Sequence, residues 1–266
     1  MRISMVIPSF YPATVYGGTI FSSLHTVKSL VARGHEVWVS TTNTNMHGKL
    51  DVPVNQFTEM EPGLMVKYYD ETIVDKFSYA LYKGLREDLE KADVVHVQAI
   101  FNTPVPRALS LARRLDKPTL LSPRGVLGEW IMGQGNPLKR MWLKQLIAPH
   151  VPRIRWHATS QQESDEIRSH FPDANISEIP NGVDLSTFQE PEYMDAAAFH
   201  KAFGGPHAAT PSVRIVSMGR IHRKKGFDIL IKSFQQLLET HPDAHLYIAG
   251  QNEGAQSDAI PADQIV

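Results

Sequence analysis

The fold is decided by residues 1–42, which read MRISMVIPSFYPATVYGGTIFSSLHTVKSLVARGHEVWVSTT. The apolar run ISMVI stops at Pro8, as expected for a buried parallel strand. The turn Gly17-Gly18 opens a segment whose apolar residues recur at helical spacing, and Gly34 closes it. The following run HEVWVSTT is typical of a second strand. These residues therefore predict a β-α-β unit with a right-handed crossover.

Strand-like and helical patterns continue to alternate along the chain. Strand-like runs span residues 64–69, 94–97, 119–121, 154–158 and 176–179, and helical patterns span residues 77–90, 105–115 and 161–170. Residues 45–63 show no clear period, and we expect a loop there, with or without a short edge hairpin. Such alternation is typical of a doubly wound parallel sheet. The predicted fold class is α/β, with a Rossmann-like N-terminal domain.

A second domain is predicted after a change in composition between residues 184 and 212. There the pattern restarts, with a strand at 213–218, a helix at 227–240 and a strand at 245–249. We predict an N-terminal domain over residues 1–190, a linker over 191–211 and the start of a second Rossmann-like domain over 212–266. One β-α-β unit of about 40 residues is too small to bury a core alone, so we expect this second domain to be truncated.

The composition excludes several classes of function. Lys and Arg total 27 and Asp and Glu total 28, so the net charge is close to zero. The protein as a whole therefore does not attract nucleic acid or an anionic membrane surface electrostatically. The absence of cysteine excludes disulfides, thiolate metal sites and cysteine nucleophiles. We expect no secretory signal at the amino terminus, and no run approaches the roughly 18 apolar residues of a membrane span. The expected location is the cytoplasm.

Two segments have the features of anion-binding sites. Gly17 and Gly18 lie where a strand passes into a helix, so their backbone N–H groups can approach a phosphate or a sugar. A tight turn without a ligand explains the same pair. Residues 219–226 read GRIHRKKG between a strand and a helix. Cations at a helix N-terminus oppose the macrodipole, so this run favours a bound diphosphate, the alternative being a solvated surface.

Together these segments resemble the retaining GT-B glycosyltransferases of family GT4. The resemblance rests on Gly17-Gly18, Asp93-Val94-Val95-His96, Ser122-Pro123-Arg124-Gly125-Val126-Leu127 with Trp130, Ser160 to Glu163, Pro180-Asn181-Gly182-Val183-Asp184, and Gly219-Arg220 followed by Lys225-Gly226. The motifs cover nearly the whole chain in a consistent order. The one that begins at Ser122 resembles a subgroup that builds bacterial surface polysaccharides.

The resemblance implies a hexosyltransferase that moves a sugar from a nucleotide-sugar to a saccharide or lipid-linked acceptor, without metal or other cofactor and without nucleic acid. The first domain would hold the acceptor and the second the donor. Arg220 and Lys225 would neutralise the donor diphosphate, and Gly17 and Gly18 would lend N–H groups from the opposite wall. The family's Glu-x₇-Glu would lie beyond Val266, so we expect these 266 residues alone to bind nucleotide-sugar weakly and transfer little.

The candidate catalytic residues are Arg124 and His96. Most of the family carries a histidine where this chain has Arg124, and a guanidinium cannot act as a base near pH 7. We therefore expect Arg124 to bind an anionic acceptor or sugar. His96 lies at the end of a buried strand, where ligands gather in open α/β sheets, although a structural histidine fits the same position.

Three further candidates for the cleft are Gly125, Asn181 and Glu163. Glu163 has the spacing of a capping box with Ser160, which we take as its main role. Asn181 and Gly182 form a turn pair that only the family context raises to a site candidate.

Residues 138–156 interleave basic and apolar side chains, as in a basic amphipathic helix. Such a helix either rests on anionic lipid at the inner face of the membrane or packs on the sheet. Two other functions fit the same architecture, a nucleotide-sugar 2-epimerase and a non-catalytic carbohydrate-binding protein.

Overall fold

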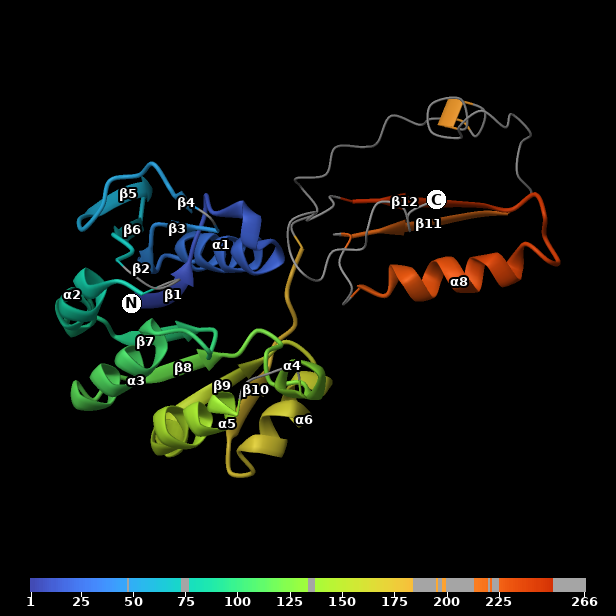
Figure 1. The fold of residues 1–266 in the computed structure, drawn as a ribbon. Helices are drawn as coiled ribbons and strands as arrows, with labels where there is room; N and C mark the ends of the chain where they lie inside the picture. The colour runs from blue at the N-terminus through green and yellow to red at the C-terminus, as the bar shows by residue number, and fades with distance from the viewer. Residues whose placement is uncertain are drawn as a thin grey trace. The chain divides into compact units, whose positions relative to one another are not determined.

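The structure is a computed structural model, and it divides the chain into two compact units, Met1–Thr187 and Phe188–Val266. The residues that it describes are 1–46, 48–72, 77–133, 137–183, 195, 198–199, 213–219, 221 and 225–250. Most of the predicted linker over residues 191–211 lies outside them. The two units are described separately below (Figure 1).

An eight-stranded sheet forms the centre of the first unit, in the order β10-β9-β8-β7-β1-β2-β6-β5. Its strands are β1 (Arg2–Ser9), β2 (Glu36–Thr42), β5 (Phe57–Glu61), β6 (Leu64–Tyr69), β7 (Val94–Gln98), β8 (Thr119–Ser122), β9 (Ile154–Ala158) and β10 (Asn175–Glu178). Strand β5 is antiparallel to β6, and the other pairs are parallel. The strand order grows outward from β1 in both directions, which confirms the predicted doubly wound α/β fold.

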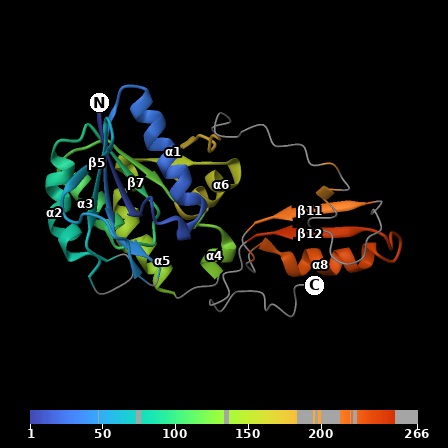
Figure 2. The same cartoon turned by 90° about the horizontal axis from the view of Figure 1, so that it is seen from above.

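Helices cover both faces of this sheet. They are α1 (Gly18–Ala32), α2 (Tyr79–Glu90), α3 (Pro104–Arg114), α4 (Glu129–Gly133), α5 (Leu138–Trp142) and α6 (Gln161–His170), with a 3₁₀ turn η1 (Thr14–Tyr16) before α1. Met5 and Ile7 pack in one core cluster with α1, whereas Val6 packs in the other with α2 and α3. In Figure 2, α1 and α2 accordingly lie on opposite sides of the strands. Burial on both faces explains the nearly continuous apolar run of β1.

The segment 45–63 contains more regular structure than the sequence indicates. A short antiparallel hairpin pairs β3 (Thr44–Asn45) with β4 (Gly48–Lys49), and β5 adds an edge strand. The expected loop therefore contains the edge hairpin that the sequence left open, since β5 is antiparallel to β6 at the end of the sheet. An edge strand is partly exposed and carries little periodicity, and here it is anchored by the ring contact between Phe57 and Trp38, with centroids 4.6 Å apart.

The predicted amphipathic helix over residues 138–156 is also shorter than expected. Helix α5 ends at Trp142, a π-helical turn η2 (Leu143–Ile147) and a 3₁₀ segment η3 (Ala148–Arg153) follow, and Trp156 lies in β9. Pro149 and Pro152 explain why no α-helix continues through η3, because proline lacks the N–H that a continuing α-helix needs.

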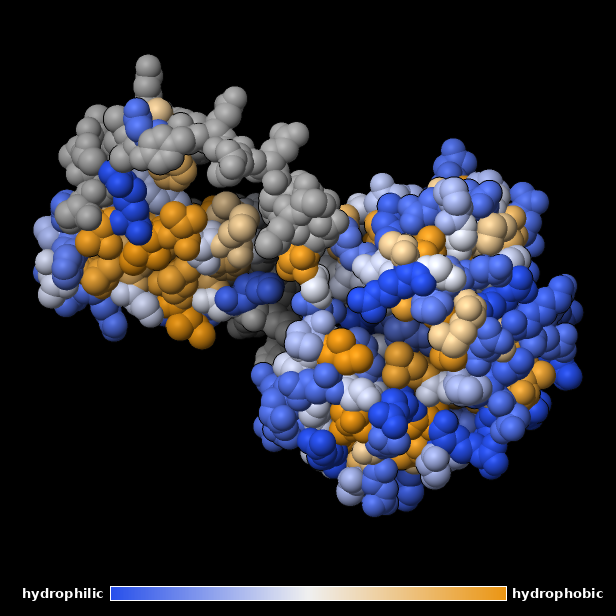
Figure 3. Space-filling view, turned by 180° about the vertical axis from the view of Figure 1, so that it is seen from behind, coloured by the Kyte–Doolittle hydropathy of each residue, from blue (hydrophilic) through white to orange (hydrophobic). Residues whose placement is uncertain are grey.

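The second unit contains the predicted strand, helix and strand. Strand β11 (Arg214–Met218) is parallel to β12 (His245–Ala249), and α8 (Phe227–Leu237) connects them, ending three residues before the predicted boundary at 240. Ile221 and Phe227 are the centre of its small core. Val216 and Met218 remain exposed, and apolar surface is visible over this unit in Figure 3.

Candidate functional site

The predicted site residues of the first unit meet at the carboxyl edge of its sheet. His96 lies in β7, Arg124 and Gly125 follow β8, Glu163 lies in the first turn of α6, and Asn181 follows β10. The carboxyl ends of parallel strands share one edge, where ligands bind in open α/β sheets. Hydrogen bonds connect His96 to Arg124 through Gln98, Arg124 to Asn181, and Glu163 to Gly125, the residue after Arg124.

Arg124 is the centre of this arrangement. Its Nε donates to Gln98 Oε1 at 2.6 Å, and its Nη1 donates to Asn181 Oδ1 at 3.1 Å. Its Nη2 is buried and has no partner among the residues that the structure describes. Because a buried guanidinium nitrogen without an acceptor is costly, Nη2 is suited to an anionic or hydroxyl oxygen of a ligand.

The turn that carries Arg124 has an unusual backbone. Arg124 has φ of 63° and Gly125 has φ of 68°, both in the left-handed region that favours glycine. Burial lowers the pKa of Arg124, and the nearby Glu163 carboxylate acts in the opposite direction. Backbone strain in an arginine is tolerated where surrounding contacts fix it, as often happens at functional sites.

Glu163 supplies one of these contacts. It is 4% exposed, and its Oε1 accepts the N–H of Gly125 at 2.7 Å. Its Oε2 accepts the backbone N–H and the hydroxyl of Thr159, both at 2.7 Å. Ser160 Oγ accepts the N–H of Glu163, as in the predicted cap, but the carboxylate bonds to Thr159 and Gly125 instead of to the backbone of Ser160. Glu163 therefore joins the start of α6 to the Arg124 turn.

His96 lies inside the protein behind Arg124. Its Nε2 lies 2.8 Å from Ser122 Oγ and 3.1 Å from Gln98 Nε2. Burial lowers the pKa of His96 to about 3, and the positive charges of Arg124 and His157 act in the same direction. The ring is therefore neutral near pH 7 and contacts Arg124 through Gln98.

Gln98, Ser122 and His157 complete this arrangement. None of them was a predicted site residue, although Ser122 begins one of the family motifs. Gln98 is two residues after His96 on β7, so both side chains point to the same face of the sheet. Ser122 is the last residue of β8, and His157 lies in β9 with Nδ1 2.9 Å from Ser122 Oγ. The usable signal was the two-residue spacing on β7 and the polar residues near the ends of adjacent strands.

The glycine turn before α1 is only partly open to a ligand. Gly17 has φ of 72°, and its N–H donates to Thr14 O at 2.9 Å. That N–H is used within the chain. Gly18 begins α1 and has no atom within 4 Å of the position of a β-carbon, so a ligand has room to approach it.

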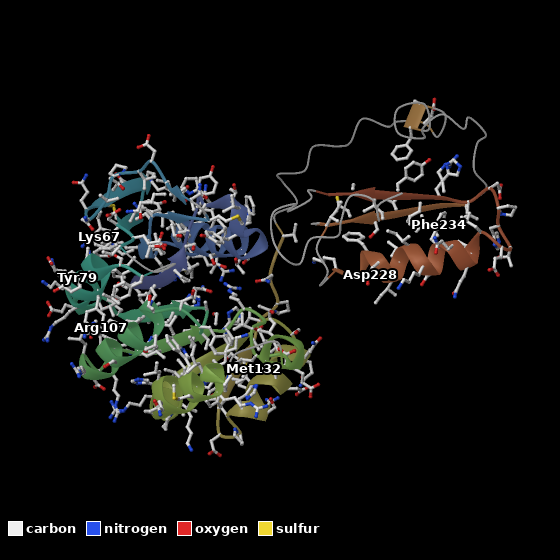
Figure 4. All side chains as sticks on the ribbon, viewed as in Figure 1. Lys67, Tyr79, Arg107, Met132, Asp228 and Phe234 are labelled. Carbon is white, nitrogen blue, oxygen red and sulfur yellow. The ribbon has the colours of Figure 1, made fainter. Side chains whose placement is uncertain are left out.

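In the second unit, Lys225 is exposed just before α8, and Gly226 caps that helix with φ of 68°. Asp228 lies in the first turn of α8, at the end marked in Figure 4. Its carboxylate offsets part of the positive helix end. Arg220 lies outside the described residues.

A cavity of about 400 Å³ lies at the opposite edge of the first sheet, beside Thr119 and Ile154 at the amino ends of β8 and β9. None of the predicted site residues lines it. Within the described ranges, no group of three or more His, Asp or Glu side chains is placed to hold a metal. No helix in that part of the chain has the length and apolarity to cross a membrane.

Two family models match the chain. Glycosyltransferase Family 4 matches residues 16–187, and Glycosyl transferases group 1 matches residues 205–260. The phosphatidylinositol N-acetylglucosaminyltransferase GPI3 subunit of Saccharomyces cerevisiae (strain YJM789) is 22% identical over 260 residues, covering 94% of this chain and 52% of the yeast protein. The putative glycosyltransferase YtcC of Bacillus subtilis (strain 168) is 34% identical over 82 residues, or 30% of this chain and 20% of that protein. The chain thus spans about half the length of the yeast relative.

Solved structures show the same fold. Anabaena Alr3699/HepE in complex with UDP-glucose has a TM-score of 0.61 and 15% identity, covering 97% of this chain and 63% of that chain. Trehalose-6-phosphate from E. coli bound with UDP-2-fluoro glucose has a TM-score of 0.60 and 12% identity, covering 97% and 66%. The Family 4 model spans well over half of the sequence and includes the turn of Arg124, the cap of Glu163 and the segment of Asn181. The chain belongs to Glycosyltransferase Family 4.

Proposed function

We propose that this protein is a retaining glycosyltransferase that moves a hexosyl group from a nucleotide-sugar to a saccharide or lipid-linked acceptor, in the biosynthesis of a surface polysaccharide. The observation that carries the proposal is the buried Nη2 of Arg124 at the carboxyl edge of the sheet. Membership of Family 4 and two similar folds that contain UDP-glucose or its fluorinated analogue support it.

Arg124 would bind the acceptor or the transferred sugar and would not act as an acid or a base. Its guanidinium stays charged near pH 7, so it holds an anionic or hydroxyl group of the acceptor or of the transferred sugar by charge-assisted hydrogen bonds. Gln98 and Asn181 already fix two of its three nitrogens, so Nη2 is presented in one direction. Such preorganised donors stabilise charge that develops during transfer.

The donor diphosphate would be bound by Gly18, Arg220 and Lys225. An N–H group at the start of α1 and two cations from the 212–266 domain provide complementary charge. Residues 1–190 would hold the acceptor. This chemistry is electrostatic and needs no metal or other cofactor, and nucleic acid has no part in it.

We also assign the protein to the cytoplasm, in peripheral contact with the inner face of the membrane. Leu138, Met141 and Leu146 are exposed on α5 and η2, next to the exposed cations Arg140 and Lys144. An apolar strip flanked by cations is suited to anionic lipid, and the yeast relative's name includes a phosphatidylinositol. In vesicle flotation, the protein should bind anionic vesicles, and Met141→Glu should release it. Absence of binding by the wild type removes the membrane contact but leaves the transfer activity.

The direct test is incubation of the protein at its native length with UDP-, GDP- and ADP-sugars and candidate acceptors, measuring released nucleotide and retained anomeric configuration. Acceptor-dependent release supports the proposal, and Arg220→Ala should reduce it sharply. Epimerised donor without acceptor would identify a nucleotide-sugar 2-epimerase. Glycan binding without consumption of any donor would identify a non-catalytic carbohydrate-binding protein.

A further inference from the structure

We propose that His157 is a positioning residue for Arg124 and acts on it through Ser122, His96 and Gln98. These side chains form one hydrogen-bonded chain across β9, β8 and β7 that ends on the guanidinium. The role of Arg124 as a ligand-binding group rests on the function proposed above, whereas the hydrogen-bonded chain is a property of the fold. We name it the His157–Arg124 chain.

The Arg124 end of the chain fixes the direction of the first two hydrogen bonds. An arginine nitrogen donates and never accepts, so the Gln98 atom 2.6 Å from Arg124 Nε is the carbonyl oxygen. The amide nitrogen of Gln98 then lies 3.1 Å from His96 Nε2 and donates to it. His96 Nε2 must therefore accept and carry no proton.

The other end of the chain is fixed by a backbone carbonyl. His157 Nε2 lies 2.8 Å from Ile179 O, which accepts, so this nitrogen carries a proton. Ser122 Oγ lies 2.8 Å from His96 Nε2 and 2.9 Å from His157 Nδ1, and it has one proton to donate. The single lone pair of His96 Nε2 is then shared by the Gln98 and Ser122 donors in a three-centre hydrogen bond, and Ser122 must accept from His157 Nδ1. This pattern meets every contact only when His157 carries a proton on both nitrogens.

Loss of the proton on His157 Nδ1 reverses the hydrogen bond between this nitrogen and Ser122. Nδ1 then becomes an acceptor, and Ser122 turns its hydroxyl toward it. His96 must then carry its one ring proton on Nε2 instead of Nδ1 to meet Ser122, and Gln98 must rotate its amide to accept from His96. The rotated amide presents its NH₂ group to Arg124 Nε, so the arginine loses its acceptor. Buried donors without an acceptor are costly, so this change releases Arg124 from Gln98.

The surroundings allow His157 to be the end that exchanges its proton. His157 is half-buried, whereas His96 and Ser122 are buried. The positive charge of Arg124, which follows β8, disfavours a second positive charge on His96. Glu163 of α6 lies near Arg124, and its carboxylate stabilises the charged guanidinium. Arg155, on β9 itself, donates to Ser177 of β10 at 2.9 Å, and the neighbouring Glu178 accepts from Ser164 of α6. Among the described residues, the charges that bear on the chain are Arg124 and Glu163.

The test is a pH titration of the ¹⁵N-labelled full chain, which follows the imidazole nitrogens and the Nε–H of Arg124 by NMR. At low pH we expect His157 to be protonated on both nitrogens, His96 to be unprotonated on Nε2, and the Arg124 Nε–H to show the shift of a hydrogen-bonded group. As His157 loses its proton, the Arg124 signal should change with the same midpoint. A constant Arg124 signal through the His157 titration, or a proton on His96 Nε2 while His157 is doubly protonated, overturns the proposal.

A pair of matched variants separates coupling from general structure. Ser122→Ala removes the one hydroxyl in the chain, so His157 should still titrate while the Arg124 signal no longer follows it. Ser23→Ala removes another buried serine hydroxyl, in α1, and should leave the coupling intact. Coupling that survives in Ser122→Ala contradicts the proposal. If that variant does not fold, the wild-type titration alone decides. No nucleotide-sugar is present, so failure of the proposed function leaves this test valid.

Discussion

Arg124 and Asn181 lie 57 residues apart in the sequence, and a 3.1 Å hydrogen bond from Nη1 to Oδ1 joins them at the carboxyl edge of the sheet. The same guanidinium donates to Gln98 from Nε at 2.6 Å. Residues from two separate strand ends thus hold one side chain, and its third nitrogen remains for a ligand.

Replacing Arg124 with Lys should reduce kcat/KM for sugar transfer by roughly tenfold to a hundredfold. The ammonium keeps the charge but cannot bond to Gln98, Asn181 and a ligand at once, and one lost charge-assisted hydrogen bond costs about 1.5 to 3 kcal/mol. Steady-state kinetics measure the change. Arg155→Lys, at an exposed arginine on β9, is the matched control and should keep full activity. An unchanged kcat/KM in Arg124→Lys contradicts the assignment.

Glu163→Gln should lower the free energy of unfolding by about 1 to 3 kcal/mol. One carboxylate oxygen becomes an NH₂ group facing either the N–H of Gly125 or the donors of Thr159, so a buried donor meets another donor. Urea denaturation measures the loss. Asp165→Asn, on the exposed side of α6, should stay within about 0.5 kcal/mol of the wild type. Equal stabilities for the two variants would show that Glu163 acts only as a helix cap.

Asp88→Asn should be strongly destabilising, by about 3 to 5 kcal/mol. Asp88 lies on the buried face of α2, where Lys67 Nζ is 3.0 Å from Oδ1 and the hydroxyls of Tyr69 and Ser40 donate to Oδ2. Burial, followed by the charge of Asp88, raises the pKa of Tyr69, so the phenol remains a donor. Figure 4 labels Lys67 near this helix.

Denaturation of Asp88→Asn should be compared with that of Glu90→Gln, two residues along α2. Glu90 pairs with Arg86 at the surface, where such pairs contribute up to about 1 kcal/mol. A loss below that value in Asp88→Asn would mean that Lys67 finds another partner.

Gly84→Ala in α2 should destabilise the protein by about 1 to 3 kcal/mol, although alanine is the better helix former by about 0.5 to 1 kcal/mol. A β-carbon at Gly84 would lie 2.5 Å from the hydroxyl of Tyr69, which is 2% exposed and hydrogen-bonded to Asp88. The cost of the clash with Tyr69 therefore exceeds the gain from the higher helix propensity of alanine. Thermal or urea unfolding measures the result.

A double-mutant cycle with Tyr69→Phe checks the cause of that loss, because removing the hydroxyl should restore part of the stability of Gly84→Ala. Gly133→Ala, where no atom lies within 4 Å of the added carbon, is the control and should be neutral. Simple additivity of the Gly84 and Tyr69 changes would show that the clash is elsewhere.

His96 should make the protein less stable in acid. Its pKa is about 3 in the folded protein and near 6.5 when unfolded, so below pH 6.5 the unfolded chain binds one more proton. The contribution of neutral His96 to the free energy of unfolding is fully present above pH 6.5. It falls by about 1.4 kcal/mol per pH unit toward pH 3. Urea denaturation of the wild type and of His96→Gln at pH 7 and pH 5 measures it. If the free energy of unfolding changed by the same amount between pH 7 and pH 5 in both proteins, His96 could not be neutral and buried.

Sequence patterns located several elements of the fold well. Strands β6 and β9, helix α6 and strand β12 have the predicted ends, because turn and cap residues bound each of these segments. The same reasoning left an edge hairpin open for residues 45–63 but did not locate β5, which is a partly exposed edge strand. It also extended one helix across Pro149 and Pro152, where periodicity alone misleads.

The sequence by itself determined that polar residues gather at the ends of parallel strands, because strand direction in a doubly wound sheet places those ends on one edge. His96 was identified in this way, whereas the resemblance to family GT4 pointed to Arg124, Glu163 and Asn181. Only the tertiary structure decided how they are connected. The partners Gln98, Ser122 and His157 depend on sheet register and side-chain facing, and those are set by packing between strands that are distant in the chain.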